Sequence, residues 1–341
     1  AWYDASAVSL AHLFGARSLF RAWLVDEALC SMNDEPSLLN RQQSFLVGAM
    51  VFLECLAAII HDQSFDTLSH IRRFSALAPG QRVYPNPWTG ISTPLFVHLA
   101  ETAVIMRLKR IFNDGPVESN KEARTEISAA AKLLYRRTLL FTRPDRAMME
   151  ETKDVTTPLG HLITMDDAFR LVVLMELARA FPEIVLDDFE LPAAPPRGVA
   201  AQKAVLDFAI AILTLVCTLP DGSGANAMLS IPLLTAGSAL QSPRTPGRQH
   251  LDMSGSYGAQ ATIAAVMHSP SMLRHWREQT KSRLMRTYKH VGLAPVRLAS
   301  QLVQEVWRRA DLADCNDDGA DGSMVHWMDI MIEKRLETLF G

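Results

Sequence analysis

The sequence lacks the clustered cysteines that a metal site would need. Its 341 residues include four cysteines, which stand far apart at Cys30, Cys55, Cys217 and Cys315. A structural zinc ion needs closely spaced ligands, so we predict no metal site and no cofactor in this chain. Cys55 and Cys217 lie in apolar helical runs, and we expect both to be buried. Free thiols are typical of the reducing cytosol or nucleus.

A basic stripe is also missing. The formal net charge is −3, and the short runs of Lys and Arg are scattered along the chain. A domain that binds DNA through its phosphates concentrates positive charge on one face. We therefore expect no direct contact between this chain and nucleic acid. Hydrophobic residues make up 48% and charged residues 21%, which excludes a mainly disordered chain.

Long uninterrupted apolar runs are absent as well. Residues 45–60 are interrupted by Glu54 and residues 205–219 by Asp207, and both runs fall short of the roughly 18–20 residues that span a bilayer. We predict two buried core helices and no membrane contact. Residues 1–4 lack the basic segment of a signal peptide. The chain does not start with methionine, which we interpret as a sign of a fragment.

Helical periodicity, in contrast, extends along nearly the whole chain, and runs with the period of two that is typical of strands are not found. We therefore predict an all-α fold, a large multi-helix bundle or helical array without a substantial β-sheet. Residues 143–163 are polar and are expected to form a long loop, and Thr164 is expected to cap the helix that follows. The predicted helices cover residues 5–28, 42–60, 93–112, 121–141, 164–181, 199–219, 257–268, 271–289, 295–309 and 324–340.

One interruption bears on domain organisation. Residues 183–198 contain three prolines, as linkers often do. We favour an internal loop of a single domain spanning residues 1–341, because the helices on either side are too apolar to be stable alone. A sub-domain break at 183–198 is the alternative.

The segment 229–239 predicts a further short helix. Pro232 stands near its start, where proline fits the first helical turn. The small residues 236–239 allow close packing, and Gly237 has no side chain at all. We expect a buried helix that another backbone approaches closely.

The acidic stretch 314–322 is the strongest candidate for chemistry. Residues 317–321 match a D-D-x-x-D pattern, which binds magnesium and diphosphate when it lies on a helix, but nearby glycines disfavour a helix. Asp314, Asn316 and Asp318 match the first positions of a calcium loop whose closing glutamate is missing. We interpret the stretch as an acidic surface loop between two helices.

No catalytic set accompanies it. The sequence contains neither a dinucleotide-binding G-x-G-x-x-G motif nor a Walker loop. A G-x-S-x-G turn around a nucleophilic serine must follow a β-strand. No strand is predicted before residues 254–258, so they do not form such a turn. We name no catalytic residue and favour a non-catalytic function.

Several short motifs follow one another along the chain. They are His12-Leu13-x-Gly15-Ala16-x-x-Leu19, Trp88-x-Gly90-x-Ser92-x-x-Leu95, Ile231-Pro232-Leu233-Leu234-Thr235-Ala236-Gly237, Val306-Trp307 and Trp327-Met328-Asp329-Ile330-Met331. In this order they resemble the regulatory, or middle homology, domain of fungal zinc-cluster transcription factors, of the second family of fungal-specific transcription factor domains. Ile231 and Leu234 stand where that family has aromatic residues.

The resemblance implies a nuclear, non-catalytic domain that controls DNA binding or activation by binding an effector or partner. It implies that DNA contacts and zinc belong to an N-terminal six-cysteine cluster, which this chain does not contain. A homodimer and a small-molecule effector are compatible with it. The signature residues His12, Gly15, Ala16, Pro232, Leu233, Gly237, Trp307 and Trp327 have structural roles in this interpretation, and the ligand-binding residues remain unassigned.

An alternative uses the same helical scaffold without a DNA-binding half. The chain would then be a cytoplasmic enzyme or small-molecule-binding protein of fungal secondary metabolism. Helical bundles readily enclose apolar pockets, which such a function would need.

Overall fold

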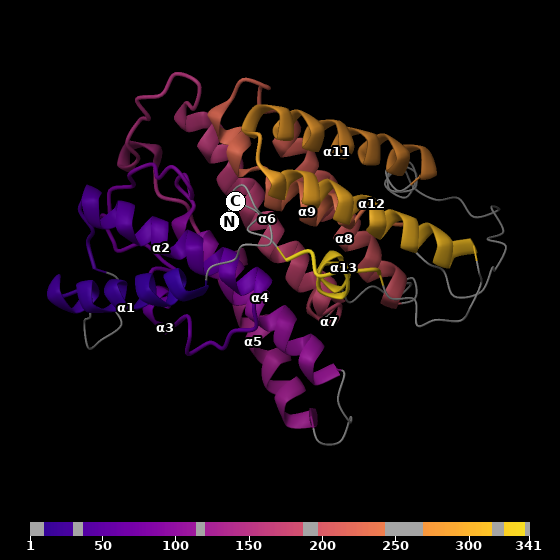
Figure 1. The fold of residues 1–341 in the computed structure, drawn as a ribbon, viewed down its shortest axis with the longest axis horizontal. Coiled ribbons are helices and arrows are strands. Elements are labelled where there is room, and N and C mark those ends of the chain that lie inside the picture. The colour runs from indigo at the N-terminus through magenta and orange to yellow at the C-terminus, as the bar shows by residue number, and fades with distance from the viewer. Residues whose placement is uncertain are drawn as a thin grey trace.

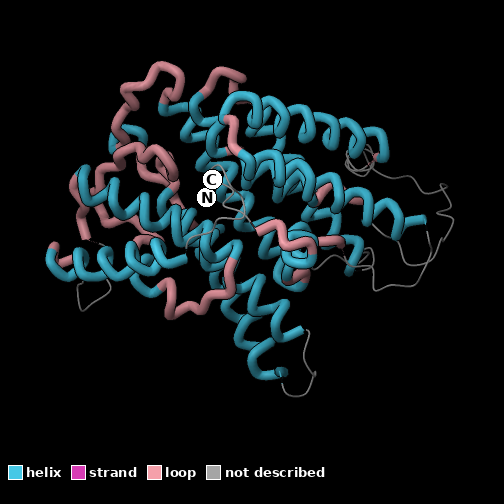
Figure 2. Tube along the Cα trace, viewed as in Figure 1, coloured by secondary structure: helices cyan, strands magenta, loops and turns pink. Residues whose placement is uncertain are grey.

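The computed structural model describes residues 10–29, 37–113, 120–186, 197–242, 269–315 and 324–337, although the side chains of residues 10, 186, 197, 314 and 315 are not described. These residues form helices and loops, and their only β-type contacts are two isolated bridges, Val83 with Met149 and Asn86 with Gly90 (Figure 2). The predicted all-α fold is confirmed. The helices are α1 (Leu10–Asp26), α2 (Arg41–Ile60), α3 (Ser69–Arg72), α4 (Thr93–Asn113), α5 (Lys121–Leu139), α6 (Leu159–Ala180), α7 (Glu183–Leu186), α8 (Arg197–Cys217), α9 (Ser230–Ser238), α11 (Pro270–Val291), α12 (Ala294–Cys315) and α13 (Trp327–Glu333).

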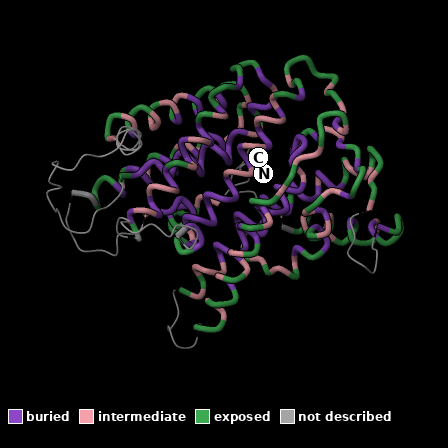
Figure 3. Tube along the Cα trace, turned by 180° about the vertical axis from the view of Figure 1, so that it is seen from behind, coloured by how far each residue is buried: buried purple, intermediate pink, exposed green. Residues whose placement is uncertain are grey.

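Helix α6 connects the two ends of the fold (Figure 1). It packs against α4 and α5 on the N-terminal side and against α8 and α9 on the C-terminal side. Helix α4 in turn contacts α2, and α9 contacts α11 and α12. One hydrophobic cluster runs through all of these contacts, and the buried faces turn inward (Figure 3). The C-terminal elements therefore reach the N-terminal ones largely through α6.

The two apolar helices are core helices. Helix α2 begins with a capping box, in which Asn40 Oδ1 accepts from the backbone N–H of Gln43 at 2.9 Å and Gln43 Oε1 accepts from that of Asn40 at 3.0 Å. Both α2 and α8 are long and apolar enough to cross a membrane by length and composition, which corrects the length argument above. Most of the apolar stretch of α2 and just over half of that of α8 are buried inside the protein.

Helix α6 starts earlier than the sequence indicates. It begins at Leu159, directly after Pro158, and Thr164 lies inside it with its hydroxyl bonded to the carbonyl of Gly160 at 3.2 Å. The prediction that Thr164 caps the helix is therefore wrong. Leu159 and Leu162 are buried in the first turn of α6. Polar residues surround them in the sequence, so the sequence predicts a loop for this segment.

The proline-rich interruption lies between helices that pack on each other. Helix α7 follows Pro182, α8 begins at Arg197, and residues 187–196 lie outside the described residues. Helices α6 and α8 are in extensive contact, and their buried side chains belong to the same hydrophobic cluster.

The two cysteines of the apolar helices α2 and α8 differ in environment. Cys55 is fully buried in α2, as predicted. Cys217 is exposed at the end of α8, so the prediction of its burial is wrong. The neighbouring Val216 turns into the core, which leaves the next position about 100° further round the helix, toward the surface. Cys30 lies outside the described residues.

Helix α9 is buried at every position from Ser230 to Ser238. Pro232 lies in its first turn. A Cβ atom added at Gly237 would stand 2.6 Å from Cγ2 of Thr280 on α11 and 3.4 Å from Cγ1 of Val303 on α12. The close neighbour at Gly237 is therefore a side chain, and not another backbone as expected from the sequence. The indole of Trp307 on α12 donates to the carbonyl of Gly237 at 2.8 Å.

Gly237→Ala is expected to lower the free energy of unfolding by about 1–3 kcal/mol, because the new methyl group would force Thr280 to move in a packed core. Urea unfolding followed by circular dichroism measures this change. Gly160→Ala is the matched control, since nothing lies within 4 Å of the added atom in the first turn of α6. It should leave stability unchanged or raise it by up to about 1 kcal/mol. Equal stabilities of the two variants would contradict the close contact at Gly237.

Candidate functional site

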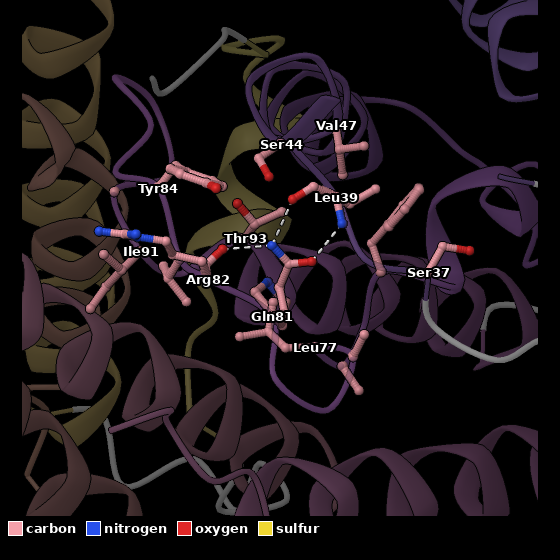
Figure 4. Close-up of a pocket in the computed structure, with 16 residues that line it drawn as sticks. Ser37, Leu39, Ser44, Val47, Leu77, Gln81, Arg82, Tyr84, Ile91 and Thr93 are labelled. Atoms are coloured by element: carbon pink, nitrogen blue, oxygen red, sulfur yellow. Dashed lines mark hydrogen bonds between the residues drawn. The ribbon is translucent and has the colours of Figure 1, made fainter. Parts of the chain in front are cut away.

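A small pocket lies beside the start of α2 and the loop before α4 (Figure 4). Gln81 reaches across it. Its Nε2 donates to the carbonyls of Leu39 at 2.9 Å and Arg82 at 2.6 Å, and its Oε1 accepts from the N–H of Leu39 at 2.6 Å. The cavity of about 50 Å³ has room for little more than water. This pocket serves the packing of the loop, and it is too small for a metabolite.

A hollow of about 650 Å³ lies beside the loop after α5, but its basic side chains already have partners. Arg143 pairs with Asp167 at 2.8 Å, and Arg146 pairs with Glu151 at 2.9 Å. Arg170 donates to two backbone carbonyls at the end of α5. Asp145, Asp166 and Asp167 also line this hollow, so its three arginines meet an equal number of carboxylates.

A cleft of about 610 Å³ lies where α4 and α6 end, α8 begins and the chain enters α13. Its size is within the range of small-molecule sites. It combines an apolar wall with a cluster of charged side chains. Its lining residues are Lys109, Arg110, Asn113, Ala178, Arg179, Ala180, Pro182, Gly198, Ala201, Gln202, Val205, Met324, His326 and Asp329. We name it the α4–α13 cleft.

Arg179 is the buried cation of this cleft, with 9% of its surface exposed. Its Nη1 donates to the hydroxyl of Ser238 at 2.8 Å, and its Nη2 donates to the carbonyls of Ser238 at 3.3 Å and Val325 at 2.6 Å. These acceptors are neutral, and the buried Nε has no partner among the described residues. No carboxylate of the described residues lies within 4 Å of this guanidinium, and burial lowers the pKa of Arg179.

One turn earlier on α6, Glu176 is fully buried and binds the segment that leads into α13. Its Oε2 accepts from His326 Nε2 and its Oε1 accepts from the indole of Trp327, both at 2.9 Å. The tautomer of His326 follows from its other contact, since its Nδ1 accepts from the backbone N–H of Met328 at 3.1 Å. His326 is therefore neutral and carries its proton on Nε2.

The surroundings of Glu176 and His326 lower the pKa of both side chains. Burial alone would raise the pKa of Glu176, but His326, Arg179 and Trp327 hold it at about 2. Burial, together with the charges of Arg179 and Arg110, lowers the pKa of His326 to about 4. Glu176 is thus ionised and His326 neutral near pH 7.

Gln241 completes the attachment of the same segment. Its Nε2 donates to the carbonyls of Ser238 and Val325, both at 2.7 Å, and its Oε1 accepts from the N–H of Val325 at 3.0 Å. We call Glu176, Arg179, Gln241, His326 and Trp327 the α13 clamp. Through it, side chains from α6, from the residues after α9 and from α13 fix one wall of the cleft.

The structure separates the signature residues into two groups. His12 and Gly15 lie exposed on α1, and Ala16 is half-buried there. The others lie at the opposite end of the fold: Pro232, Leu233 and Gly237 are buried in α9, Trp307 bonds to Gly237, and Trp327 belongs to the α13 clamp. Trp327 follows His326, which lines the α4–α13 cleft.

The acidic candidate stays untested. Asn316 and Asp318 lie outside the described residues, and Asp314 lies in the last turn of α12 with its side chain not described. Among the described side chains, no group of three or more His, Cys, Asp or Glu is placed to hold a metal ion.

Glu176 and Arg179 are not among the residues predicted from the sequence to have a functional role. A usable signal was present, because these residues stand three positions apart in an otherwise apolar run of α6. Charged residues at such spacing share a helix face, and burial requires that they find partners. The partners themselves come from distant segments and cannot be identified from the run alone.

A comparison with protein-family models matches this chain. A family described as "Fungal specific transcription factor domain" has a model that matches residues 1–341. The comparisons with curated proteins and with solved structures gave no match.

Stability is expected to fall as the pH drops from about 6.5 toward 4. In the unfolded chain His326 titrates near pH 6.5, whereas in the fold its pKa is about 4. Between pH 6.5 and pH 4, His326 is protonated in the unfolded state and neutral in the folded state. Acid therefore favours unfolding. Once His326 is protonated in both states, its lowered pKa has reduced the free energy of unfolding by about 3 kcal/mol. Urea unfolding at a series of pH values measures it.

The His326→Gln variant provides the control. Its stability should depend less steeply on pH over the same interval, whatever its stability at pH 7. Some dependence will persist, because burial also lowers the pKa of His98 to about 3. If the free energy of unfolding of His326→Gln depends on pH as steeply as that of wild type, His326 does not contribute to the pH dependence.

Proposed function

Since this chain belongs to the family of fungal-specific transcription factor domains, we propose that it is the non-catalytic regulatory domain of a transcription factor, spanning residues 1–341 as one unit. An effector or partner bound to it controls DNA binding or activation by the full-length protein. The observation that carries the effector part is the α4–α13 cleft, where Arg179 is buried without an anionic partner among the described residues.

The physical mechanism is a shift between two packings of the α13 segment. A ligand changes such an equilibrium only by interacting differently with the two states. The α13 clamp supports this mechanism, because its polar contacts hold α13 and at the same time form a wall of the cleft. A ligand in the cleft therefore reaches the element that it would move.

In this proposal the DNA contacts lie elsewhere. The net charge of −3 supports this division. A zinc-cluster region N-terminal to this chain would bind the DNA, and zinc would be needed only there. The protein would act in the nucleus. The family match does not favour the alternative of an enzyme or binding protein of secondary metabolism.

The direct test uses the natural full-length gene product in a DNA selection and a reporter assay. We expect sequence-specific DNA binding, and we expect Arg179→Met to change the reporter output. The exposed Lys281→Met on α11 is the control and should leave the output unchanged. A full-length product without sequence-specific DNA binding would contradict the proposal.

Self-association is also part of the proposal. Helices α1 and α2 expose several large apolar side chains, among them Leu19, which is 74% exposed, Val25, Phe45 and Leu46. Such surfaces often mark protein interfaces.

Sedimentation of the purified chain should show a dimer, and Leu19→Glu should weaken it. The matched control is Leu140→Glu, which changes a similarly exposed leucine after α5. A wild-type chain that stays monomeric would contradict this part.

A further inference from the structure

The charges that line the α4–α13 cleft do not balance. Among the described lining residues, Lys109, Arg110 and Arg179 face a single carboxylate, that of Asp329. Glu176 lies one layer deeper, where His326 and Trp327 already occupy its two oxygens. The described lining of the cleft therefore carries an excess of positive charge, in a chain whose net charge is negative.

The three cations differ in how far they are already compensated. Arg110 pairs with Asp329. Lys109 donates to the carbonyl of Ala180, lies 4.7 Å from the ring centroid of Phe181, and has a pKa lowered by burial. Arg179 has only neutral acceptors and a buried Nε without a partner among the described residues. Glu176 and Asp329 offset the charge of Arg179 without direct contact, so an anionic ligand that touched the guanidinium would add to this compensation.

The backbone around the cleft adds to this preference. Helix α8 begins there, and Gly198 in its first turn lines the cleft. The first turn of a helix carries partial positive charge. The ends of α4 and α6 carry the opposite partial charge, but Lys109 occupies the Ala180 carbonyl and Arg124 occupies the Phe112 carbonyl.

The remaining lining is apolar. Ala178, Pro182, Ala201, Val205 and Met324 contribute it, from α6, from the residue after it, from α8 and from the segment before α13. A bare inorganic anion would leave this surface uncovered. An anion with an apolar body would use both parts of the cleft, since apolar contact supplies most of the affinity of small-molecule sites and charged groups fix the orientation.

We propose that the α4–α13 cleft binds a small organic acid, with its carboxylate among Arg179, Arg110 and Lys109 and its apolar body against α6 and α8. This inference rests on the proposed function in taking the same cleft as the effector site. It adds a mechanism. The ligand carboxylate competes with Asp329 for Arg110, and Asp329 lies in the first turn of α13. Binding therefore weakens one tie of α13 to α4.

The test compares two probes that differ mainly in charge, phenylacetate and phenylacetamide, against the purified chain. Calorimetric titration at constant ionic strength gives the affinities, and thermal unfolding gives the shift in Tm. We expect phenylacetate to bind at least about tenfold more tightly than the amide and to raise Tm. Equal affinities would overturn the proposal, because the charge would then have no role. Tighter binding of inorganic phosphate than of phenylacetate would overturn the claim that an apolar body of the ligand contacts α6 and α8.

Variants locate the site. Lys109→Met keeps the length of the side chain and removes its charge, and it should weaken phenylacetate binding at least about fivefold. Lys281→Met is the matched control on the exposed face of α11 and should leave the affinity unchanged. Circular dichroism checks that both variants are folded. Equal affinities of wild type and Lys109→Met would place the ligand elsewhere and contradict the assignment.

The two proposals fail separately. If the full-length protein regulates DNA-dependent transcription but the chain binds no organic acid, the cleft assignment is wrong and the family role stands. If the chain binds phenylacetate through Lys109 but the full-length protein has no sequence-specific DNA binding, the site stands and the regulatory function is wrong.

Discussion

Two charged side chains in the middle of an apolar helix hold the C-terminal segment of this protein in place. Glu176 and Arg179 share one face of α6, the helix that contacts both halves of the fold. Glu176 accepts from His326 and Trp327, and Arg179 donates to Ser238 and Val325. Because buried charges are stable only with their hydrogen bonds made, these partners have little freedom to move independently. The position of α13 is thus set by polar geometry as well as by apolar packing.

The same side chains give the α4–α13 cleft its character. Arg179 and His326 line it, so the contacts that attach α13 also shape the cavity beside it. A ligand there acts on a network whose members depend on one another, and removing one partner leaves another buried without compensation. This arrangement makes a small local change consequential for α13. In the proposed function, this arrangement is what would let a small molecule bound in the cleft act on α13.

Much of the fold could be predicted from the sequence, because helix boundaries depend on local signals. Helices α2, α5 and α11 begin within one residue of their predicted starts, and α4 begins at its predicted Thr93 and ends at Asn113, one residue beyond its predicted end. The start of α6 was missed because Pro158 offers no side-chain cap. The cleft could not be predicted, since its lining comes from segments between Lys109 and Asp329 that only tertiary packing brings together. The charged pair on α6 was its one local signal.

Hydrogen exchange of wild type and Glu176→Gln tests the central claim most directly. The substitution keeps the shape of the side chain and removes the charge that binds His326 and Trp327. We predict faster exchange at the amides of α13, between Met328 and Glu333, while the amides of α2 keep their protection. Unchanged protection of α13, or an equal loss in α2 and α13, would contradict the claim that the clamp on α6 holds this segment.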